Sequence, residues 1–105
     1  MKKKFLNILK KKNKTKIVCL TSYSKNISKI TDKYCDITLV GDSLANVLYG
    51  MENTHKVSLA MMINHAKSVR KGVKKSLMVV DMPKGSYKNT KEALKNAKKI
   101  IKETK

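Results

Sequence analysis

The sequence predicts an α/β fold in which parallel strands alternate with amphipathic helices. Three short apolar runs rich in β-branched residues are typical of buried parallel strands: Ile17–Leu20, Ile37–Val40 and Leu77–Val80. The segments between and after these runs repeat their apolar residues every three or four positions, as helices that cover a sheet do. The order is a short helix followed by β-α-β-α-β-α, which specifies a parallel sheet with right-handed crossovers.

A brief basic helix is expected over residues 3–12, before the first strand. Its apolar face lies among lysines and consists of Phe5, Leu6, Ile8 and Leu9. Asn13 and Lys14 end this helix. We therefore divide the chain into an N-terminal helical segment, residues 1–13, and a β/α segment, residues 14–105.

The second helix follows the first strand. Ser24 is placed to cap the N-terminus of this helix. The apolar stripe of the helix consists of Ile27, Ile30 and Tyr34. Residues 44–57, which come after the second strand, show little regular period and contain Gly50. We therefore expect an elaborated loop over residues 44–57.

Two longer helices are expected in the rest of the chain. Ser58 opens the first, which ends near Gly72 and has an apolar stripe of Leu59, Met62, Ile63, Ala66, Val69 and Val73. Asn89, with Glu92 three residues later, resembles a capping pair at the start of the second. The stripe of that last helix consists of Ala93, Leu94, Ala97, Ile100 and Ile101.

The chain carries a large positive charge, which raises nucleic acid or an anionic membrane as partners. There are 25 Lys and Arg residues against 7 Asp and Glu, a net charge of +18. However, the lysines are spread over the whole chain and Arg70 is the only arginine, so the residue best suited to bidentate phosphate contacts is almost absent. Aromatic residues are too few, at 5%, for a base-stacking platform. A solvated lysine surface with no specific nucleic-acid partner is therefore expected, with a basic nucleic-acid-binding protein as the alternative.

The cysteines and the hydropathy bear on the compartment. Cys19 and Cys35 form no CxxC pair, and Cys19 lies in an apolar run, which predicts a small buried hydrophobic residue. Two isolated thiols suit a reducing cytoplasm. No apolar stretch approaches the roughly 20 residues of a membrane span, and the basic start of the chain fits neither a signal nor a transit peptide. A cytoplasmic location without a membrane partner is expected.

Two of the three predicted strands end at a carboxylate. Asp42 follows Val40 and Gly41, and Asp81 directly follows Val80. If these strands are neighbours, they lie about 4.8 Å apart, and both carboxylates reach one point at the carboxyl edge of the sheet. Oxygen ligands in that arrangement suit Mg²⁺. The alternative is that each aspartate hydrogen-bonds its own backbone at the start of a loop.

Other polar residues near the predicted strand ends receive simpler interpretations. Tyr23 and Tyr87 are interpreted as packing at the rim, and His65, off the apolar stripe of its helix, as a solvated surface residue. His55 is given no role. Gly85 and Ser86 are interpreted as a turn before the last helix.

Three segments resemble the ketopantoate hydroxymethyltransferase family in order and spacing. They are KIVCLTSYS at residues 16–24, DITLVGDSLANVLYG at residues 36–50 and SLMVVDMPKGSY at residues 76–87. The helix from Ser58 to Gly72 also looks like the family's second barrel helix. The GDSL tetrapeptide alone is a weak signal, but GDSL followed at this distance by VVDMP and GSY is highly specific.

The resemblance implies a Mg²⁺-dependent enzyme with a TIM (β/α)₈ barrel and a decameric homo-oligomer. Such enzymes transfer a hydroxymethyl group from 5,10-methylenetetrahydrofolate to 3-methyl-2-oxobutanoate, giving 2-dehydropantoate for pantothenate and coenzyme A synthesis. By the same resemblance, Asp42 and Asp81 are metal ligands, and Asp42, Ser43 and Asp81 contact the keto acid. Residues 14–105 would be the first three β/α units of that barrel.

The resemblance also indicates what these residues lack. The family's catalytic base, its third metal-associated carboxylate and its substrate-contacting lysine correspond to positions beyond residue 105, so we expect the N-terminal part of a longer catalyst. A (β/α)₈ barrel takes about 250 residues. The alternatives are an inactive truncated product, and an enzyme of the phosphoenolpyruvate mutase and isocitrate lyase type acting on a similar enolate.

Within the matched region the chain departs from the family pattern at a few positions. Lys84 stands where an apolar or aromatic residue is usual, and Lys56 where proline is usual. Ala60 and Met61 replace an acidic pair, and Asn46 is a further local change. These changes concern the folate-side packing and the first turn of a helix, and leave Asp42 and Asp81 in place.

Overall fold

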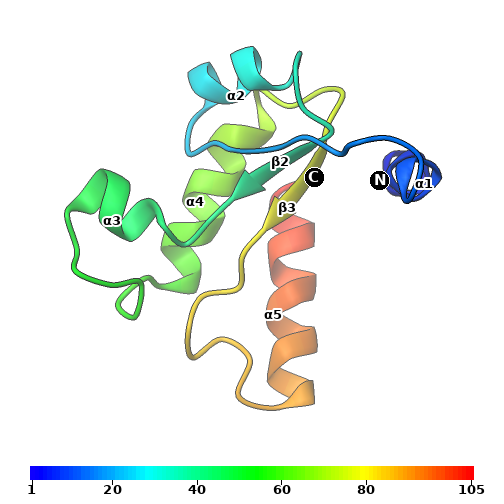
Figure 1. The fold of residues 1–105 in the computed structure, drawn as a ribbon. Coiled ribbons are helices and arrows are strands. Elements are labelled where there is room, and N and C mark those ends of the chain that lie inside the picture. Colours follow the sequence, from blue (N-terminus) through cyan, green and yellow to red (C-terminus); the bar gives the residue numbers. More distant parts are fainter.

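The computed structural model describes all of residues 1–105. It shows an α/β fold with one small sheet and five helices, which confirms the predicted class (Figure 1). In chain order the elements are α1 (Lys2–Lys11), β1 (Cys19–Thr21), α2 (Lys25–Thr31), β2 (Ile37–Val40), α3 (Leu44–Tyr49), α4 (Leu59–Arg70), β3 (Leu77–Val80) and α5 (Thr90–Glu103).

The three strands form a parallel sheet, as expected, and their order is β1-β2-β3. Thr21 of β1 lies beside Leu39 of β2, and Val40 of β2 lies beside Val80 of β3. Because the central strand, β2, pairs with both β1 and β3, it fixes the register of both neighbours. Their carboxyl ends meet at one edge of the sheet, where ligands of parallel α/β folds gather.

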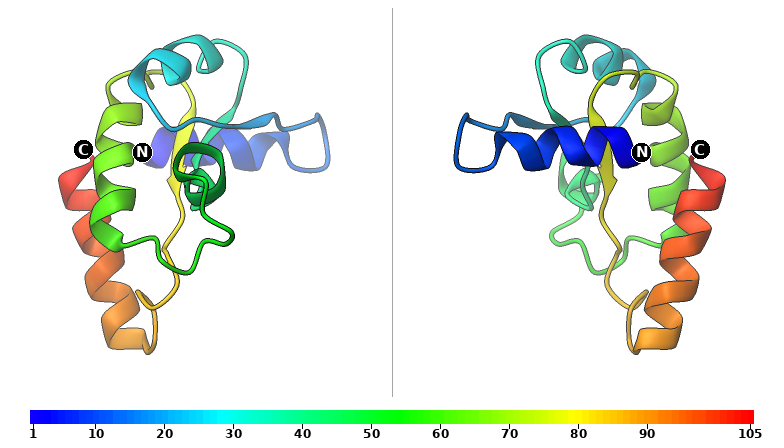
Figure 2. Two further views of the ribbon diagram at one scale, coloured as in Figure 1. Left: turned by 90° about the vertical axis from the view of Figure 1, so that its left-hand side faces the viewer. Right: turned by 90° about the vertical axis from the view of Figure 1, so that its right-hand side faces the viewer.

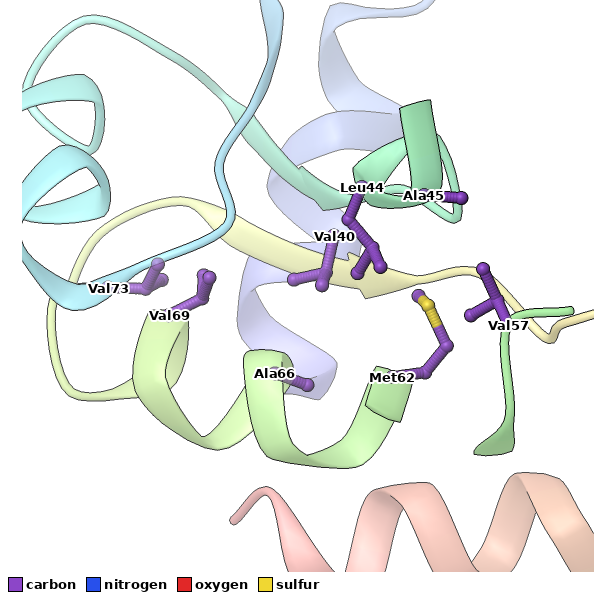
Figure 3. Close-up of a cluster of buried hydrophobic side chains, with 8 residues drawn as sticks. All are labelled: Val40, Leu44, Ala45, Val57, Met62, Ala66, Val69 and Val73. Atoms are coloured by element: carbon purple, nitrogen blue, oxygen red, sulfur yellow. The ribbon is translucent and has the colours of Figure 1, made fainter. Parts of the chain in front are cut away.

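The main hydrophobic core lies between β2 and α4. Val40 points from the strand toward α4, and Met62, Ala66 and Val69 project from the helix to meet it (Figure 3). Met78 and Val80 of β3 pack against the same cluster. The eight buried members of the cluster are Val40, Leu44, Ala45, Val57, Met62, Ala66, Val69 and Val73. The predicted apolar stripe of α4 is thus confirmed, as is its cap, since Ser58 Oγ accepts from the Met61 amide at 3.1 Å.

The first strand differs from its prediction in position and burial. β1 begins at Cys19, two residues later than expected, and all three of its residues are exposed. The prediction that Cys19 is buried was therefore wrong. The reason is that β1 is an edge strand, hydrogen-bonded only to β2, so an apolar run there gains little cover from these residues.

The apolar stripe predicted for α2 is also not buried. Ile27, Ile30 and Tyr34 are 51%, 59% and 73% exposed, whereas the small polar Ser28 is fully buried. The Ser28 hydroxyl donates to the Val69 carbonyl at 3.0 Å. The helix therefore approaches the end of α4 by its backbone and small residues, and leaves its apolar stripe in solvent.

Residues 44–49 form helix α3, so the prediction of a loop from 44 to 57 was wrong over its first part. Leu44 and Ala45 are fully buried, which supplies the packing that a six-residue helix needs. Gly50 ends the helix at φ 63°, in the left-handed region that glycine adopts without strain.

The two terminal helices follow the predicted ranges closely. α1 lies crosswise to α4 and α5 (Figure 2), and Lys4 Nζ donates to the Ser76 carbonyl at 3.0 Å. Asn89 caps α5 by accepting from the Glu92 amide at 2.9 Å, but of the α5 stripe only Ile100 is buried. None of the helices combines the length and apolar character that crossing a membrane requires.

A buried carboxylate ties α2 to the turn before β3. Asp32, just after α2, is 6% exposed and accepts from the amides of Lys74, Lys75 and Ser76 at 2.8 to 3.2 Å, and from the Ser76 hydroxyl at 2.7 Å. Partial burial by itself would raise the pKa of Asp32. The four donors outweigh it and lower the pKa to about 2, because each stabilises the charged form.

Gly72 allows α2 and α4 to meet closely, and a methyl group there should destabilise the fold. A Cβ at this position would lie 2.1 Å from Ser28 Oγ and 2.5 Å from the Lys25 carbonyl oxygen. We expect Gly72→Ala to lower the free energy of unfolding by about 1–3 kcal/mol, measured by urea denaturation of the natural polypeptide that contains these residues. Lys71→Ala, which also introduces alanine but at the exposed neighbouring residue, where a Cβ is already present, is the control. Equal stability of the two variants would contradict the close approach.

Ionised Asp32 should make stability depend on acid pH. Its folded pKa of about 2 lies below the ordinary 3.8, so its contribution is present above about pH 4 and is lost as the pH falls toward about 2. Asp32→Asn should remove that dependence and lower the free energy of unfolding at neutral pH by about 2 kcal/mol. Urea titrations over this pH range test it, with exposed Glu52→Gln as the control. An unchanged pH profile in Asp32→Asn would show that the carboxylate is not the stabilising group.

Candidate functional site

The carboxyl ends of β2 and β3 bring two aspartates together. Because Val40 and Val80 are register partners, Asp42 and Asp81 leave the sheet side by side. The Asp42 amide donates to Asp81 Oδ2 at 3.1 Å, and the Asp81 amide donates to the Val40 carbonyl at 3.0 Å. The two strands predicted from the sequence are thus neighbours, and the residues that follow them share one edge of the sheet.

Gly41, in the turn between β2 and α3, lies close to the side chain of Ser43. A Cβ there would lie 3.0 Å from Ser43 Oγ and 3.6 Å from Asp81 Oδ2. A side chain at this position would therefore crowd the serine hydroxyl, while its contact with the carboxylate across the turn would be an ordinary one. A residue without a side chain lets Asp42, Ser43 and Asp81 converge.

The two aspartates are half-buried and have no cationic partner within the chain. The ion pairs of the structure are Lys11 with Asp36 and Lys67 with Glu103, both away from this edge. In a chain with 25 basic residues, two adjacent carboxylates remain unpaired. Two carboxylates at one edge of the sheet without a basic partner form an arrangement that suits a bound cation.

The donor set restricts which cation fits. No three His, Cys, Asp or Glu side chains of the structure converge in a way that could hold a metal ion. Two carboxylates, with water or substrate oxygens completing the shell, are what Mg²⁺ accepts, whereas a zinc site needs three or four protein ligands of the nitrogen and sulfur type. Asp42 and Asp81 are therefore suited to a hard divalent cation.

Ser43, the third residue expected at this site, is held by a tyrosine. Its hydroxyl lies 2.7 Å from the Tyr23 hydroxyl, which reaches it from the segment after β1. Tyr23 was interpreted as rim packing from the sequence, and this contact was missed. The signal was available, since Tyr23 follows β1 and Ser43 follows β2 at neighbouring positions along one sheet edge.

His65 hydrogen-bonds the backbone of Tyr23 and the side chain of Tyr49, so the prediction of a solvated surface histidine was wrong. Its Nδ1 lies 2.9 Å from the Tyr23 carbonyl, and since a carbonyl only accepts, Nδ1 carries the hydrogen. In the neutral ring Nε2 then accepts from the Tyr49 hydroxyl, 2.9 Å away. The tyrosine and histidine rings meet edge to face at 5.9 Å. α3 and α4 thereby fix the segment that carries Tyr23.

None of the remaining candidates forms a side-chain hydrogen bond or an ion pair with the aspartates. Tyr87 is 54% exposed, and Lys84 is exposed as well. His55 is exposed in the loop after α3, where its amide bonds Asn53 Oδ1 at 3.0 Å. Ser86 donates to the Pro83 carbonyl from both its amide and its hydroxyl, and Gly85 has φ 86°, which confirms the predicted turn.

Comparison with known proteins gives consistent matches. The family model of ketopantoate hydroxymethyltransferase matches residues 2–105. The chain is 68% identical over 105 residues to the 3-methyl-2-oxobutanoate hydroxymethyltransferase of Pelagibacter ubique (strain HTCC1062), covering 100% of the chain and 41% of that relative. Proteins of the same name from Rhizobium etli and Anaplasma marginale (strain St. Maries) are 55% and 50% identical, over 84% and 94% of the chain and 33% and 36% of their own lengths. The chain thus spans about two fifths or less of these relatives.

The hydrogen bond between the two aspartates should be visible in amide exchange. Asp81→Ala removes the acceptor of the Asp42 amide, so we expect that amide to exchange at least about tenfold faster. Asp81→Asn keeps a side-chain oxygen and should stay close to the parent protein. Hydrogen exchange resolved at Asp42 by NMR or mass spectrometry measures the difference. Equal protection in the alanine and asparagine variants would refute this bond.

Proposed function

Because the chain belongs to the ketopantoate hydroxymethyltransferase family, we propose that it supplies the metal- and keto-acid-binding part of an enzyme acting on 3-methyl-2-oxobutanoate. The reaction would transfer a hydroxymethyl group from 5,10-methylenetetrahydrofolate to this 2-oxo acid and give 2-dehydropantoate, as a step of pantothenate synthesis. The acceptor is the one in the names of the relatives.

The unpaired carboxylates of Asp42 and Asp81 carry this proposal. They are adjacent, half-buried and free of any lysine or arginine partner, and so they would hold Mg²⁺ between them. Bound there, the ion would act as a Lewis acid on the oxygens of the keto acid and make its C3 proton easier to remove. The amide of Asp42 keeps Asp81 oriented for this task through the 3.1 Å hydrogen bond.

Ser43 would bind an oxygen of the keto acid. Its hydroxyl is held at 2.7 Å by Tyr23, and when Tyr23 donates that bond, the serine hydrogen stays free for the substrate. The His65 contact to the Tyr23 carbonyl limits the movement of this segment. Orientation of a substrate by prearranged groups lowers the barrier of the chemical step, because the ordering cost is met in the folded protein.

The base that removes the C3 proton and the folate-binding groups would come from outside these 105 residues. We further propose that the three β/α units belong to a (β/α)₈ barrel and to a decameric assembly. The exposure of Cys19 and Leu20 on β1 and of Val79 on β3 supports further strands or chains at these positions, since apolar strand residues in this fold class are normally covered.

Another enolate-forming barrel, of the phosphoenolpyruvate mutase and isocitrate lyase type, would also use carboxylate-held Mg²⁺. The names of relatives that are 50–68% identical support hydroxymethyl transfer instead. Assays of the two reactions separate them, because only the proposed one consumes methylenetetrahydrofolate.

Asp42→Asn and Asp81→Asn should each lower kcat/KM for 2-dehydropantoate formation by about a hundredfold or more, because each removes a charge that would hold the metal. The assay uses the natural polypeptide that contains these residues, with Mg²⁺, the keto acid and the folate. Binding of Mn²⁺, followed by electron paramagnetic resonance, gives a readout that does not depend on turnover and should weaken in both variants.

The matched control for this assay is Asp36→Asn, at the opposite end of β2, where the carboxylate pairs with Lys11. It should keep both turnover and Mn²⁺ binding. Turnover and metal affinity that survive in Asp42→Asn or Asp81→Asn as well as in the control would refute the site.

A further inference from the structure

A hollow lined by lysines lies at the end of the sheet opposite Asp42 and Asp81. It has a volume of about 570 Å³ and no apolar side chain in its wall. We call it the lysine hollow, defined by its lining residues Lys25, Lys29, Asp32, Lys33, Lys71, Gly72, Lys74 and Lys75. The proposed function does not use any of these residues.

The six lysines come from two elements. Lys25, Lys29 and Lys33 are spaced four residues apart, which places the first two on one face of α2 and the third just after it. Lys71, Lys74 and Lys75 lie on the turn between α4 and β3. All six are exposed, and none takes part in an ion pair of the structure. Six positive charges are thus gathered around a concave surface, against the single carboxylate of Asp32.

The contacts beneath the hollow hold these two rows in position. Asp32 binds the amides of Lys74, Lys75 and Ser76, which connects the end of α2 to the turn before β3. Ser28, buried at Gly72, binds the Val69 carbonyl at the end of α4. Asp32 is 6% exposed and its carboxylate is occupied by these donors. The backbone that carries the lysines is therefore preorganised even though the lysine side chains are flexible.

We propose that the lysine hollow binds a compact, multiply charged phosphate chain, of the kind found in inorganic tripolyphosphate or in the phosphate tail of a nucleotide. Six ammonium groups around a concave wall suit several phosphate oxygens at once, and lysine binds phosphate as a point charge. A phosphate chain would also relieve the mutual repulsion of the lysines.

A nucleic-acid strand is a poorer fit to the same surface. The wall has no aromatic side chain on which a base could stack, and the one arginine, Arg70, is not part of it. The surface is an open hollow between two elements rather than a stripe that follows a backbone. These features select a short phosphate chain over RNA or DNA.

The test is isothermal titration calorimetry, in which sodium tripolyphosphate is titrated into the natural polypeptide that contains these residues. The buffer contains about 0.15 M KCl, where electrostatic interactions between exposed charges are screened beyond about 8 Å. Tripolyphosphate should bind at least about tenfold more tightly than orthophosphate, because it contacts several lysines together. The triple variant Lys29→Gln/Lys33→Gln/Lys74→Gln should weaken tripolyphosphate binding by at least about tenfold.

The matched control is Lys88→Gln/Lys91→Gln/Lys95→Gln, which removes the same charge near and along the first turns of α5. It should bind tripolyphosphate as the parent protein does, and both triple variants should retain the parent circular dichroism spectrum. Equal loss in the two triple variants would show that net charge alone attracts the anion, and would overturn the proposal. No preference for tripolyphosphate over orthophosphate would overturn it as well.

Two further ligands identify the source of the phosphate chain. A nucleoside triphosphate that binds as tightly as tripolyphosphate, and is weakened by the same triple variant, would show that the phosphates alone are recognised. One that binds at least about tenfold more tightly would identify a nucleotide as the ligand. Binding of single-stranded RNA that persists in this salt, without binding of tripolyphosphate, would overturn the proposal in favour of a nucleic-acid surface.

Discussion

The packing of α4 against β2 and β3 is the interaction on which the rest of the structure depends. Val40 from the sheet and Met62, Ala66 and Val69 from the helix form a contact that buries nearly the whole apolar face of α4 (Figure 3). Burial of that face removes hydrocarbon from water and holds β2 and β3 in place side by side. At the carboxyl ends of the strands, this packing brings Asp42 beside Asp81. At their amino ends, it places the turn before β3 within reach of Asp32.

The carboxyl and amino ends of the strands differ in charge, although the chain as a whole is strongly basic. Two aspartates lie at the carboxyl edge of the sheet, and the lysine hollow lies at the amino edge. Asp42 and Asp81 meet at the carboxyl edge with no basic side chain paired to them. The lysine hollow, at the amino edge, contains a carboxylate that backbone amides and one hydroxyl already satisfy. A net charge of +18 therefore says little about the local potential at either edge. The placement of backbone donors decides where an acidic residue remains available to a cation and where it serves the fold.

The motifs that carry the family resemblance correspond to particular parts of this architecture. GDSL lies at the junction of β2 and α3, where Gly41 leaves space for the Ser43 hydroxyl. The VVDMP segment ends β3 and passes through the buried Pro83 into the turn of Gly85 and Ser86. Tyr23, from the first matched segment, holds Ser43. Each motif therefore lies at or just after the carboxyl end of one strand, and the register of the three parallel strands brings the motifs together.

The sequence by itself determined the elements whose patterns are local. The runs that became β2 and β3, the capped starts of α4 and α5, and the two aspartates after the strands follow from β-branched clusters, capping residues and helical periods, which depend only on near neighbours. The parallel direction of the strands followed from their alternation with helices.

Tertiary structure alone decided which of these surfaces are buried. α2 turned its polar Ser28 inward and its isoleucines outward because the partner is the end of α4 at Gly72, which admits only a small residue. Residues 44–49 became helical because Leu44 and Ala45 found cover in the core, and Cys19 stayed exposed because β1 is at the edge. Likewise, the contact of Tyr23 with Ser43 and the gathering of six lysines join residues far apart in the chain. Periodicity states which side chains share a face, but burial depends on what lies opposite, and that is set only when the whole chain has packed.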